Sequence, residues 1–207
     1  MVLVPQLSYN RILKDRNFYS KSMIYPITVF GDPILRKVTS EIDQNYIGLE
    51  KLVTDMFETM YNAEGVGLAA PQIGLSVRVF VVDLSPLGED NPLLKDFKKA
   101  FINPYITEKE GDKILMDEGC LSIPGIREDV LRFNTIRIKY FNENWQEYDE
   151  VYTGFAARVL QHEYDHLDGI MFVDYCSPLK KRLLKGKLSD ISKGQVTTTY
   201  KIKVPRT

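Results

Sequence analysis

Cysteine and histidine are scarce in this sequence, which holds two of each among its 207 residues. Two cysteines are too few for a disulfide framework, and they fit a reducing compartment in which a thiol can act as a ligand or a nucleophile. We therefore expect a protein that is stabilised by a hydrophobic core and that works in the cytoplasm.

Long hydrophobic runs are missing as well. No stretch approaches the roughly 20 apolar residues that cross a bilayer, so we expect no membrane association. Residues 1–22 have no uninterrupted apolar core of signal-peptide length, because Arg11, Lys14, Asp15 and Arg16 break the segment. We expect residues 1–22 to be a flexible leader and not a secretion signal.

The sequence also lacks an excess of charge of one sign. The chain has 27 basic and 28 acidic side chains, so the overall balance predicts no sequence-specific nucleic-acid binding. With 44% hydrophobic residues, a chain of this length has enough material for one compact domain. We expect that domain at residues 23–193 and a C-terminal tail at residues 194–207.

Apolar periodicity predicts three helices. Apolar residues recur at steps of three and four from Gly48 to Ala63, which is typical of a helix with one buried face. A second helix is expected at Gly154–Leu167, with Gly169 in the position of a C-terminal cap, and a third opens at Pro178. The apolar residues expected on one side of the third helix are Leu179, Leu183, Leu184, Leu188 and Ile191.

Runs rich in β-branched and aromatic residues predict strands. They lie at Val77–Leu84, Ala100–Ile106, Lys113–Glu118, Thr135–Phe141 and Glu147–Tyr152. The last residues, 197–207, fit either a short edge strand or a loose tail. These elements predict an α+β fold in which mixed, mostly antiparallel sheets pack around a central helix, with an N-terminal and a C-terminal helix beside them.

The central helix carries His162, Glu163 and His166, an H-E-x-x-H array. Residues four apart share one helix face, so both imidazoles can hold one cation while the glutamate handles its bound water. A divalent cation with three protein ligands and an open position lowers the pKa of coordinated water from about 15.7 towards 7. The array predicts a catalytic metal site, and a chance pair of histidines is the alternative.

A third protein ligand is needed, and spacing does not choose among the candidates, which are Cys120, Cys176, Asp168 and Asp174. Cys120 follows a strand and is accessible there, although a lone buried cysteine is commonly a small hydrophobic residue. A set of Cys120, Cys176, His162 and His166 would form a closed structural site, because such sites usually have four protein ligands.

Residues 65–74, GVGLAAPQIG, are rich in small residues and contain one amide, Gln72. Small residues let another backbone approach closely, so an extended peptide can lie here while Gln72 donates a hydrogen bond to a carbonyl. A plain helix-to-strand connection is the alternative.

The segments GVGLAAPQ, EGCLS and QHEYDHLDG together resemble the three signature motifs of peptide deformylases, in the same order and with no residue missing. The resemblance extends from about Met23 into the helix after Pro178. It implies a metal-dependent hydrolase that removes the N-formyl group from the N-terminal formylmethionine of newly made proteins and releases formate.

The resemblance also implies roles for single residues. Cys120, His162 and His166 hold one metal ion per chain, Glu163 is the general base and then the general acid, and Gln72 with the N–H of Leu121 forms the oxyanion hole. The implied cofactor is Fe²⁺, for which Zn²⁺, Ni²⁺ or Co²⁺ can substitute.

For the substrate, the resemblance implies an extended N-formylmethionyl chain beside the first motif. Gly65, Val66 and Gly67 meet its backbone, and Arg127 helps from the other side. The implied methionine pocket is lined by Val66, Phe155, Val159 and His162, with Arg158 near its rim. A pairing of Arg132 with Asp165 is expected to steady the metal helix.

The helical C-terminal region resembles the subgroup of the family in which this helix docks at the ribosome. The basic cluster from Lys180 to Lys187 motivates that hypothesis, and a solvated helix face is the alternative. An H-E-x-x-H zinc endopeptidase is the rival enzyme class. Such enzymes usually take their third ligand from a downstream Glu or His, whereas no histidine follows His166 here.

Overall fold

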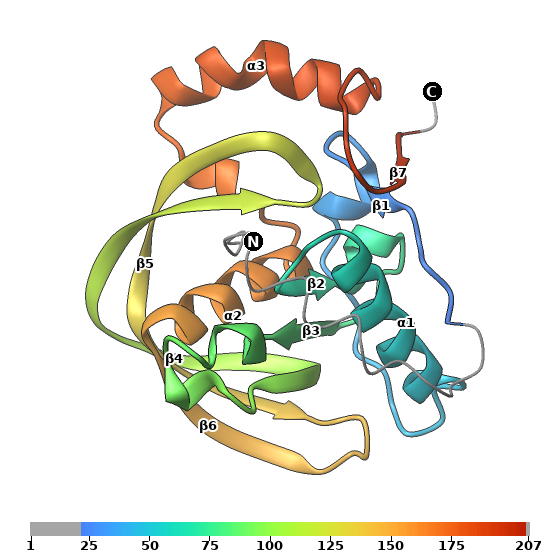
Figure 1. Ribbon diagram of the computed structural model, residues 1–207, viewed down its shortest axis with the longest axis vertical. Coiled ribbons are helices and arrows are strands. Elements are labelled where there is room, and N and C mark those ends of the chain that lie inside the picture. The colour runs from blue at the N-terminus through green and yellow to red at the C-terminus, as the bar shows by residue number, and fades with distance from the viewer. Residues whose placement is uncertain (1–21, 206–207) are drawn as a thin grey trace.

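The computed structural model describes residues 22–205, so residues 1–21 of the expected leader lie outside it (Figure 1). One sheet is five-stranded and antiparallel in the order β2-β3-β4-β5-β6, and a parallel two-stranded sheet joins β1 to β7. The strands are β1 (Ile27–Thr28), β2 (Gly67–Ala69), β3 (Val79–Asp83), β4 (Lys98–Cys120), β5 (Ile123–Phe141), β6 (Glu147–Thr153) and β7 (Ile202–Lys203). The helices are α1 (Leu49–Asn62), α2 (Gly154–Leu167) and α3 (Pro178–Ser192). This arrangement confirms the predicted α+β fold.

Helices α1 and α2 lie where apolar periodicity predicts them. The buried face of α1 includes Leu52, Met56 and Met60, which recur at the expected helical spacing. After α2, Gly169 adopts a φ of 71°, and a Cβ there would lie 2.7 Å from the backbone carbon of Arg36. A glycine is therefore required both by the left-handed backbone and by the close approach of another segment.

Helix α3 begins at Pro178 as expected, but its apolar residues do not form one buried face. Leu184 and Ile191 are buried, whereas Leu179 and Leu183 are 58% and 68% exposed. The reason is geometric, because Leu179 and Leu183 lie roughly 100° around the helix from the stripe that contains Leu184 and Ile191. Helix α3 thus packs through a narrow stripe on the outside of the molecule (Figure 1).

The longest strands differ from the sequence prediction. The expected strands at 100–106 and 113–118 are parts of one strand, β4, and β5 begins at Ile123 rather than at Thr135. Strands β4 and β5 pair from Ile102↔Phe141 to Cys120↔Ile123, with several register shifts. The residues between the two expected strands are polar, and main-chain hydrogen bonds to the partner strand hold them in place. Because such bonds do not depend on the side chains, no apolar alternation marks this part of the strand in the sequence. In the described part of residues 197–207, Ile202 and Lys203 form a short strand.

The long, curved pair β4 and β5 wraps around α2, which lies inside the curve (Figure 1). Ala157, Leu160 and Leu167 of α2 are fully buried and join Phe80 and Ile136 of the sheet in one core cluster. Each large apolar side chain buried in this way contributes about 1.5–3 kcal/mol. Among the described helices, none is long and apolar enough to cross a membrane.

Candidate metal centre

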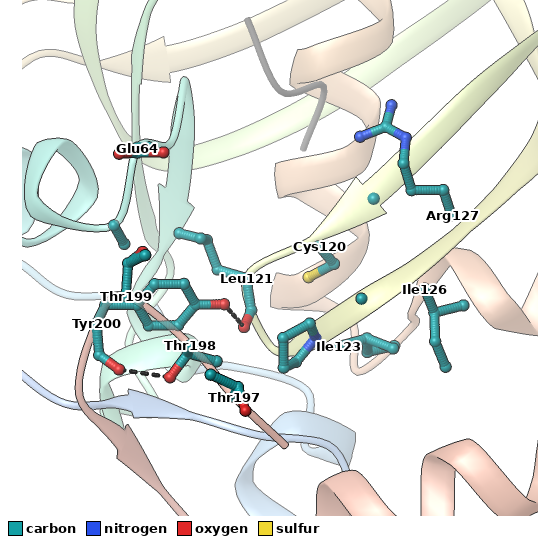
Figure 2. A pocket seen from close by; sticks show the side chains of 14 residues that line it. Glu64, Cys120, Leu121, Ile123, Ile126, Arg127, Thr197, Thr198, Thr199 and Tyr200 are labelled. Carbon is teal, nitrogen blue, oxygen red and sulfur yellow. Dashed lines mark hydrogen bonds between the residues drawn. The ribbon is translucent and has the colours of Figure 1, made fainter. Parts of the chain in front are cut away.

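A cavity of about 350 Å³ opens beside the turn between β4 and β5 (Figure 2). Cys120 and Leu121 line it where β4 ends, and Arg127 lines it where β5 begins. Residues 197–200 of the C-terminal segment line another side. The residues that line the cavity thus include a predicted metal ligand, Cys120, a predicted oxyanion donor, Leu121, and a predicted substrate residue, Arg127.

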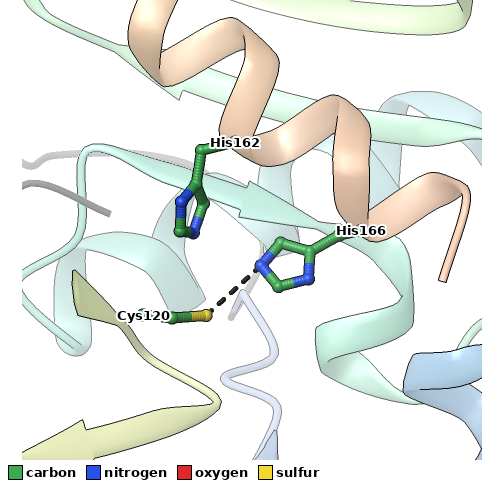
Figure 3. A group of neighbouring side chains, drawn as sticks. All are labelled: Cys120, His162 and His166. Carbon is green, nitrogen blue, oxygen red and sulfur yellow. Dashed lines mark hydrogen bonds between the residues drawn. The ribbon is translucent and has the colours of Figure 1, made fainter. Parts of the chain in front are cut away.

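Cys120 meets His162 and His166 next to this cavity (Figure 3). Helix α2 presents both imidazoles on one face, and β4 ends at the cysteine opposite them. One ligand atom from each of the three side chains lies within 4.8 Å of the others, and Cys120 Sγ is 3.2 Å from His166 Nε2. All three side chains are buried.

The other ligand candidates from the sequence lie elsewhere. Asp168 pairs with Arg78 at 2.8 Å, and Asp174 pairs with Arg36 at 2.5 Å. Within residues 22–205, the set of side chains that could hold a metal ion consists of three residues and does not include Cys176. Three ligands leave a coordination position open, which distinguishes catalytic from closed structural sites.

The chemistry of the three residues fits a divalent cation. Burial raises the pKa of the Cys120 thiol to about 11, lowers that of His162 to about 3 and lowers that of His166 well below its ordinary range. Both imidazoles are therefore neutral and have a lone pair to donate, and a cation would stabilise the buried thiolate. His166 Nδ1 also has no hydrogen-bond partner among the described residues. One sulfur and two nitrogen donors suit zinc or iron.

Glu163 follows His162 on α2 and is 1% exposed. Burial raises its pKa to about 7, the carboxylates of Glu118 and Asp165 act in the same direction, and Arg132 opposes them. A Cβ at Gly67 would lie 2.7 Å from Glu163 Cδ and 2.8 Å from Cγ, so the strand β2 approaches the carboxylate as closely as a glycine allows. The site therefore contains a buried group that can take up and release a proton near neutral pH.

Glu118 is a site residue that the sequence reasoning missed. Its Oε2 accepts a hydrogen bond from His162 Nδ1 at 2.9 Å, and its Oε1 accepts from Arg132 Nε and Arg158 Nη1, each at 2.6 Å. Burial opposes ionisation of Glu118, but the hydrogen bonds from His162 and Arg132 outweigh it and hold its pKa well below the ordinary range. A carboxylate that orients a ligating imidazole is a recurrent second layer of metal sites. Its position two residues before Cys120 on a strand, hence on the same face, was the available signal.

Two of the arginines named from the sequence, Arg132 and Arg158, lie in this buried network. The pairing of Arg132 with Asp165 is confirmed at 2.7 Å, and Tyr175 also donates to Asp165 at 2.9 Å. Arg158 was expected near the rim of the methionine pocket, and its side chain is 4% exposed and pairs with Glu118. It donates to Glu118 and to the carbonyls of Val130 and Ile114, because a buried guanidinium requires such acceptors.

The predicted oxyanion donors lie next to Cys120. Gln72 is buried in a short 3₁₀ helix (Ala70–Ile73), with Nε2 3.5 Å from Cys120 Sγ and 3.3 Å from Ser122 Oγ. Its Oε1 accepts from Ala69 N at 2.8 Å, which orients the amide nitrogen towards the thiol. Leu121, directly after Cys120, is also buried.

The predicted substrate residues are spread over several places. Gly65, Val66 and Gly67 lie at or next to the edge strand β2. Phe155 lines a second cavity of about 310 Å³, and Val159 is 1% exposed in the core. These five residues are not among those that line the cavity beside Cys120. The methionine pocket therefore stays a prediction.

Comparison with known proteins gives one consistent result. The model of a family described as polypeptide deformylase matches residues 24–182. A peptide deformylase of Christiangramia forsetii is 52% identical over 190 residues, which cover 88% of this chain and 97% of the relative. One of Cytophaga hutchinsonii is 52% identical over 183 residues, which cover 88% of this chain and 98% of the relative.

Solved structures agree with this result. A peptide deformylase from Legionella pneumophila superposes with a TM-score of 0.74 at 36% identity, covering 84% of this chain and 98% of that one. The peptide deformylase from Thermus thermophilus has a TM-score of 0.74 at 40% identity, covering 83% of this chain and 99% of that one. Agreement of this extent in sequence and in fold removes the endopeptidase alternative, and this chain belongs to the polypeptide deformylase family of metal-dependent hydrolases, which remove the N-formyl group from newly made polypeptides.

Proposed function

We propose that this chain releases formate from N-terminal formylmethionine at the cluster of Cys120, His162, His166 and Glu163. Cys120, His162 and His166 hold one divalent cation, and Glu163 moves the proton. The observation that carries the proposal is a buried carboxylate with a pKa of about 7 on the same helix as two of three clustered ligands. A structural metal site has no need of such a group.

Each residue of the site has a separate role in amide hydrolysis. A cation held at the cluster would polarise the formyl carbonyl and make a water molecule more acidic. Glu163 accepts a proton from the water that attacks the formyl carbon and donates it to the leaving amine, so that formate and a free N-terminus result. The amide of Gln72 and the N–H of Leu121 donate hydrogen bonds to the oxygen on which negative charge grows.

We propose that the substrate binds as an added strand beside β2. Strand β2 lies at one end of the five-stranded sheet and pairs with β3, so its second edge faces no other strand of that sheet. An extended peptide can use the main-chain groups near Gly65 and Gly67 there. Arg127, held by an ion pair with Asp117, supplies a positive charge on the other side of the bound peptide.

We assign Fe²⁺ as the working cation, with Zn²⁺, Ni²⁺ or Co²⁺ as substitutes. The resemblance to the family favours iron, and thiolate and imidazole ligands are compatible with all four ions. We further propose that the enzyme works in the cytoplasm, where newly formylated chains are made.

The test is formate release from formyl-Met-Ala-Ser by protein that is purified without oxygen and loaded with Fe²⁺. We expect release, its loss on chelation and its return when Fe²⁺ is restored. Cys176→Ser should keep both metal and activity, whereas Cys120→Ser should lose both, because Cys176 is not part of the cluster. Protein that retains its metal yet releases no formate would refute the proposed function.

The basic face of α3 supports a second proposal, contact with the ribosome. Lys181, Arg182 and Lys185 are exposed, whereas Lys180 pairs with Glu128 at 2.8 Å. Charge reversal at Lys181 and Lys185 should weaken co-sedimentation with ribosomes at low salt and leave formate release unchanged. Unchanged co-sedimentation would mean that these charges belong to a solvated helix face.

A further inference from the structure

The chain after α3 returns to the metal centre. Gly194 turns the backbone with a φ of 73°, and β7 then pairs in parallel with β1. Two main-chain hydrogen bonds flank this pairing, from Ile27 N to Lys201 O at 2.8 Å and from Val29 N to Lys203 O at 3.0 Å. The residues just before β7, Thr197–Tyr200, are thereby held against the cavity beside Cys120 (Figure 2).

Tyr200 connects this segment directly to the turn between β4 and β5 that follows Cys120. Its hydroxyl donates to the carbonyl oxygen of Leu121 at 2.8 Å, and its ring packs against the main core cluster. Thr198 Oγ1 donates to the carbonyl oxygen of Tyr200 at 2.7 Å, which stiffens the same turn. The segment is therefore fixed at both its side-chain and its main-chain groups.

Thr197 and Thr199 are placed differently from Thr198. Both are exposed and both line the cavity, and within residues 22–205 neither side chain forms a hydrogen bond. Each hydroxyl can donate one hydrogen bond and accept others. Thr197 and Thr199 therefore form a wall of the cavity on the side away from Arg127, and their hydroxyl groups can bond a bound molecule (Figure 2).

We propose that Thr197 and Thr199 hydrogen-bond the main chain of the substrate residues that follow formylmethionine, with Tyr200 holding this wall in position. The inference rests on the proposed function, since it assumes that the formyl group lies at Cys120 and Leu121. A peptide advances about 3.3–3.6 Å per residue when extended, so successive residues after the methionine lie farther from Cys120, and the cavity beside Cys120 reaches Thr197 and Thr199. The match to the family model ends at residue 182, so this wall lies outside the shared motifs.

The test compares a short with a long substrate, formyl-Met-Ala and formyl-Met-Ala-Ser-Ala, on the iron-loaded full chain. In the double variant Thr197→Val and Thr199→Val, which keeps side-chain shape, the ratio of kcat/KM for the long over the short peptide should fall about five-fold. The change should arise in KM for the long peptide, because hydrogen bonds made equally in the ground state and the transition state affect binding. Tyr200→Phe removes one hydroxyl and keeps the ring, and it should lower the same ratio.

Thr107→Val, at an exposed position of β4, is the matched control and should leave the ratio unchanged. A ratio that stays at the parental value in both tail variants would overturn the inference and leave the proposed function standing. Equal losses on both peptides would also overturn it, because they would indicate a general structural role. Absence of formate release from either peptide by the iron-loaded parent would overturn the proposed function and this inference together.

Discussion

Replacing Glu163 with glutamine should lower formate release by roughly 10²- to 10⁴-fold, the range expected when a general acid–base group is removed. Glutamine keeps the shape of the side chain beside Gly67 but can neither accept nor donate the transferred proton. The three ligands are untouched, so the variant should retain its metal, measured by elemental analysis alongside kcat. Glu143→Gln, at an exposed turn position, is the control and should behave like the parent.

The same variant should lack one contribution that lowers the stability of the protein as the pH rises. Burial raises the pKa of Glu163 from 4.5 to about 7. Between these values the unfolded chain has lost the proton that the folded chain still holds, so the free energy of unfolding falls as the pH rises through this window. Glutamine has no proton to lose. The lowered pKa values of His162 and His166 act in the opposite direction in both proteins. Urea denaturation of metal-free protein should therefore show a change in the free energy of unfolding from pH 5 to pH 8 that is more positive for Glu163→Gln than for the parent, and an equal change would contradict the assignment.

Replacing Glu118 with glutamine should reduce the free energy of unfolding by about 3–5 kcal/mol, the loss expected when one partner of a buried ion pair is removed. Glu118 is fully buried, and it accepts hydrogen bonds from Arg132 and Arg158, whose side chains are each 4% exposed. When residue 118 carries no charge, the two guanidinium groups stay buried, and Asp165 is the one carboxylate of the network that remains. Urea denaturation of the metal-free protein measures the effect.

Glu118→Gln should also weaken metal binding by about 10- to 100-fold, because His162 Nδ1 loses the carboxylate that orients its ring. Competition with a chelator measures this change. Asp149→Asn is the matched control, since it breaks the exposed ion pair with Arg137 on β5, and screened surface pairs contribute little. If Glu118→Gln were no more destabilising than Asp149→Asn, the buried network would not be a principal source of stability.

Periodic elements could be predicted from the sequence because their cause is local. Helix α2 starts and ends where its apolar spacing and Gly169 predict, and the spacing of His162 and His166 on one helix face follows from helix geometry alone. The middle of β4 could not be predicted in this way. Its residues 107–112, between the two expected strands, are exposed and are held as a strand by pairing with β5, which is a long-range interaction.

The role of each polar residue depends on where the fold buries its side chain. Arg158 reads in the sequence as a polar residue near a pocket, but in the fold it neutralises Glu118 in a buried network of two carboxylates and two guanidinium groups. Spacing alone left the choice between Cys120 and Cys176 open, the motif around Cys120 implied this residue, and the fold brings its thiol to α2. The burial of Arg158 has no such local signature.

The sequence by itself determined the family, the metal-binding motif and the three helices, because motif spacing and apolar periodicity are properties of neighbouring residues. The tertiary structure alone decided that Glu118 links His162 to two arginines and that Thr197–Tyr200 line the cavity beside Cys120. These contacts join segments far apart in the chain, and they form because the curved β4–β5 pair and the β1–β7 pairing bring those segments together around α2.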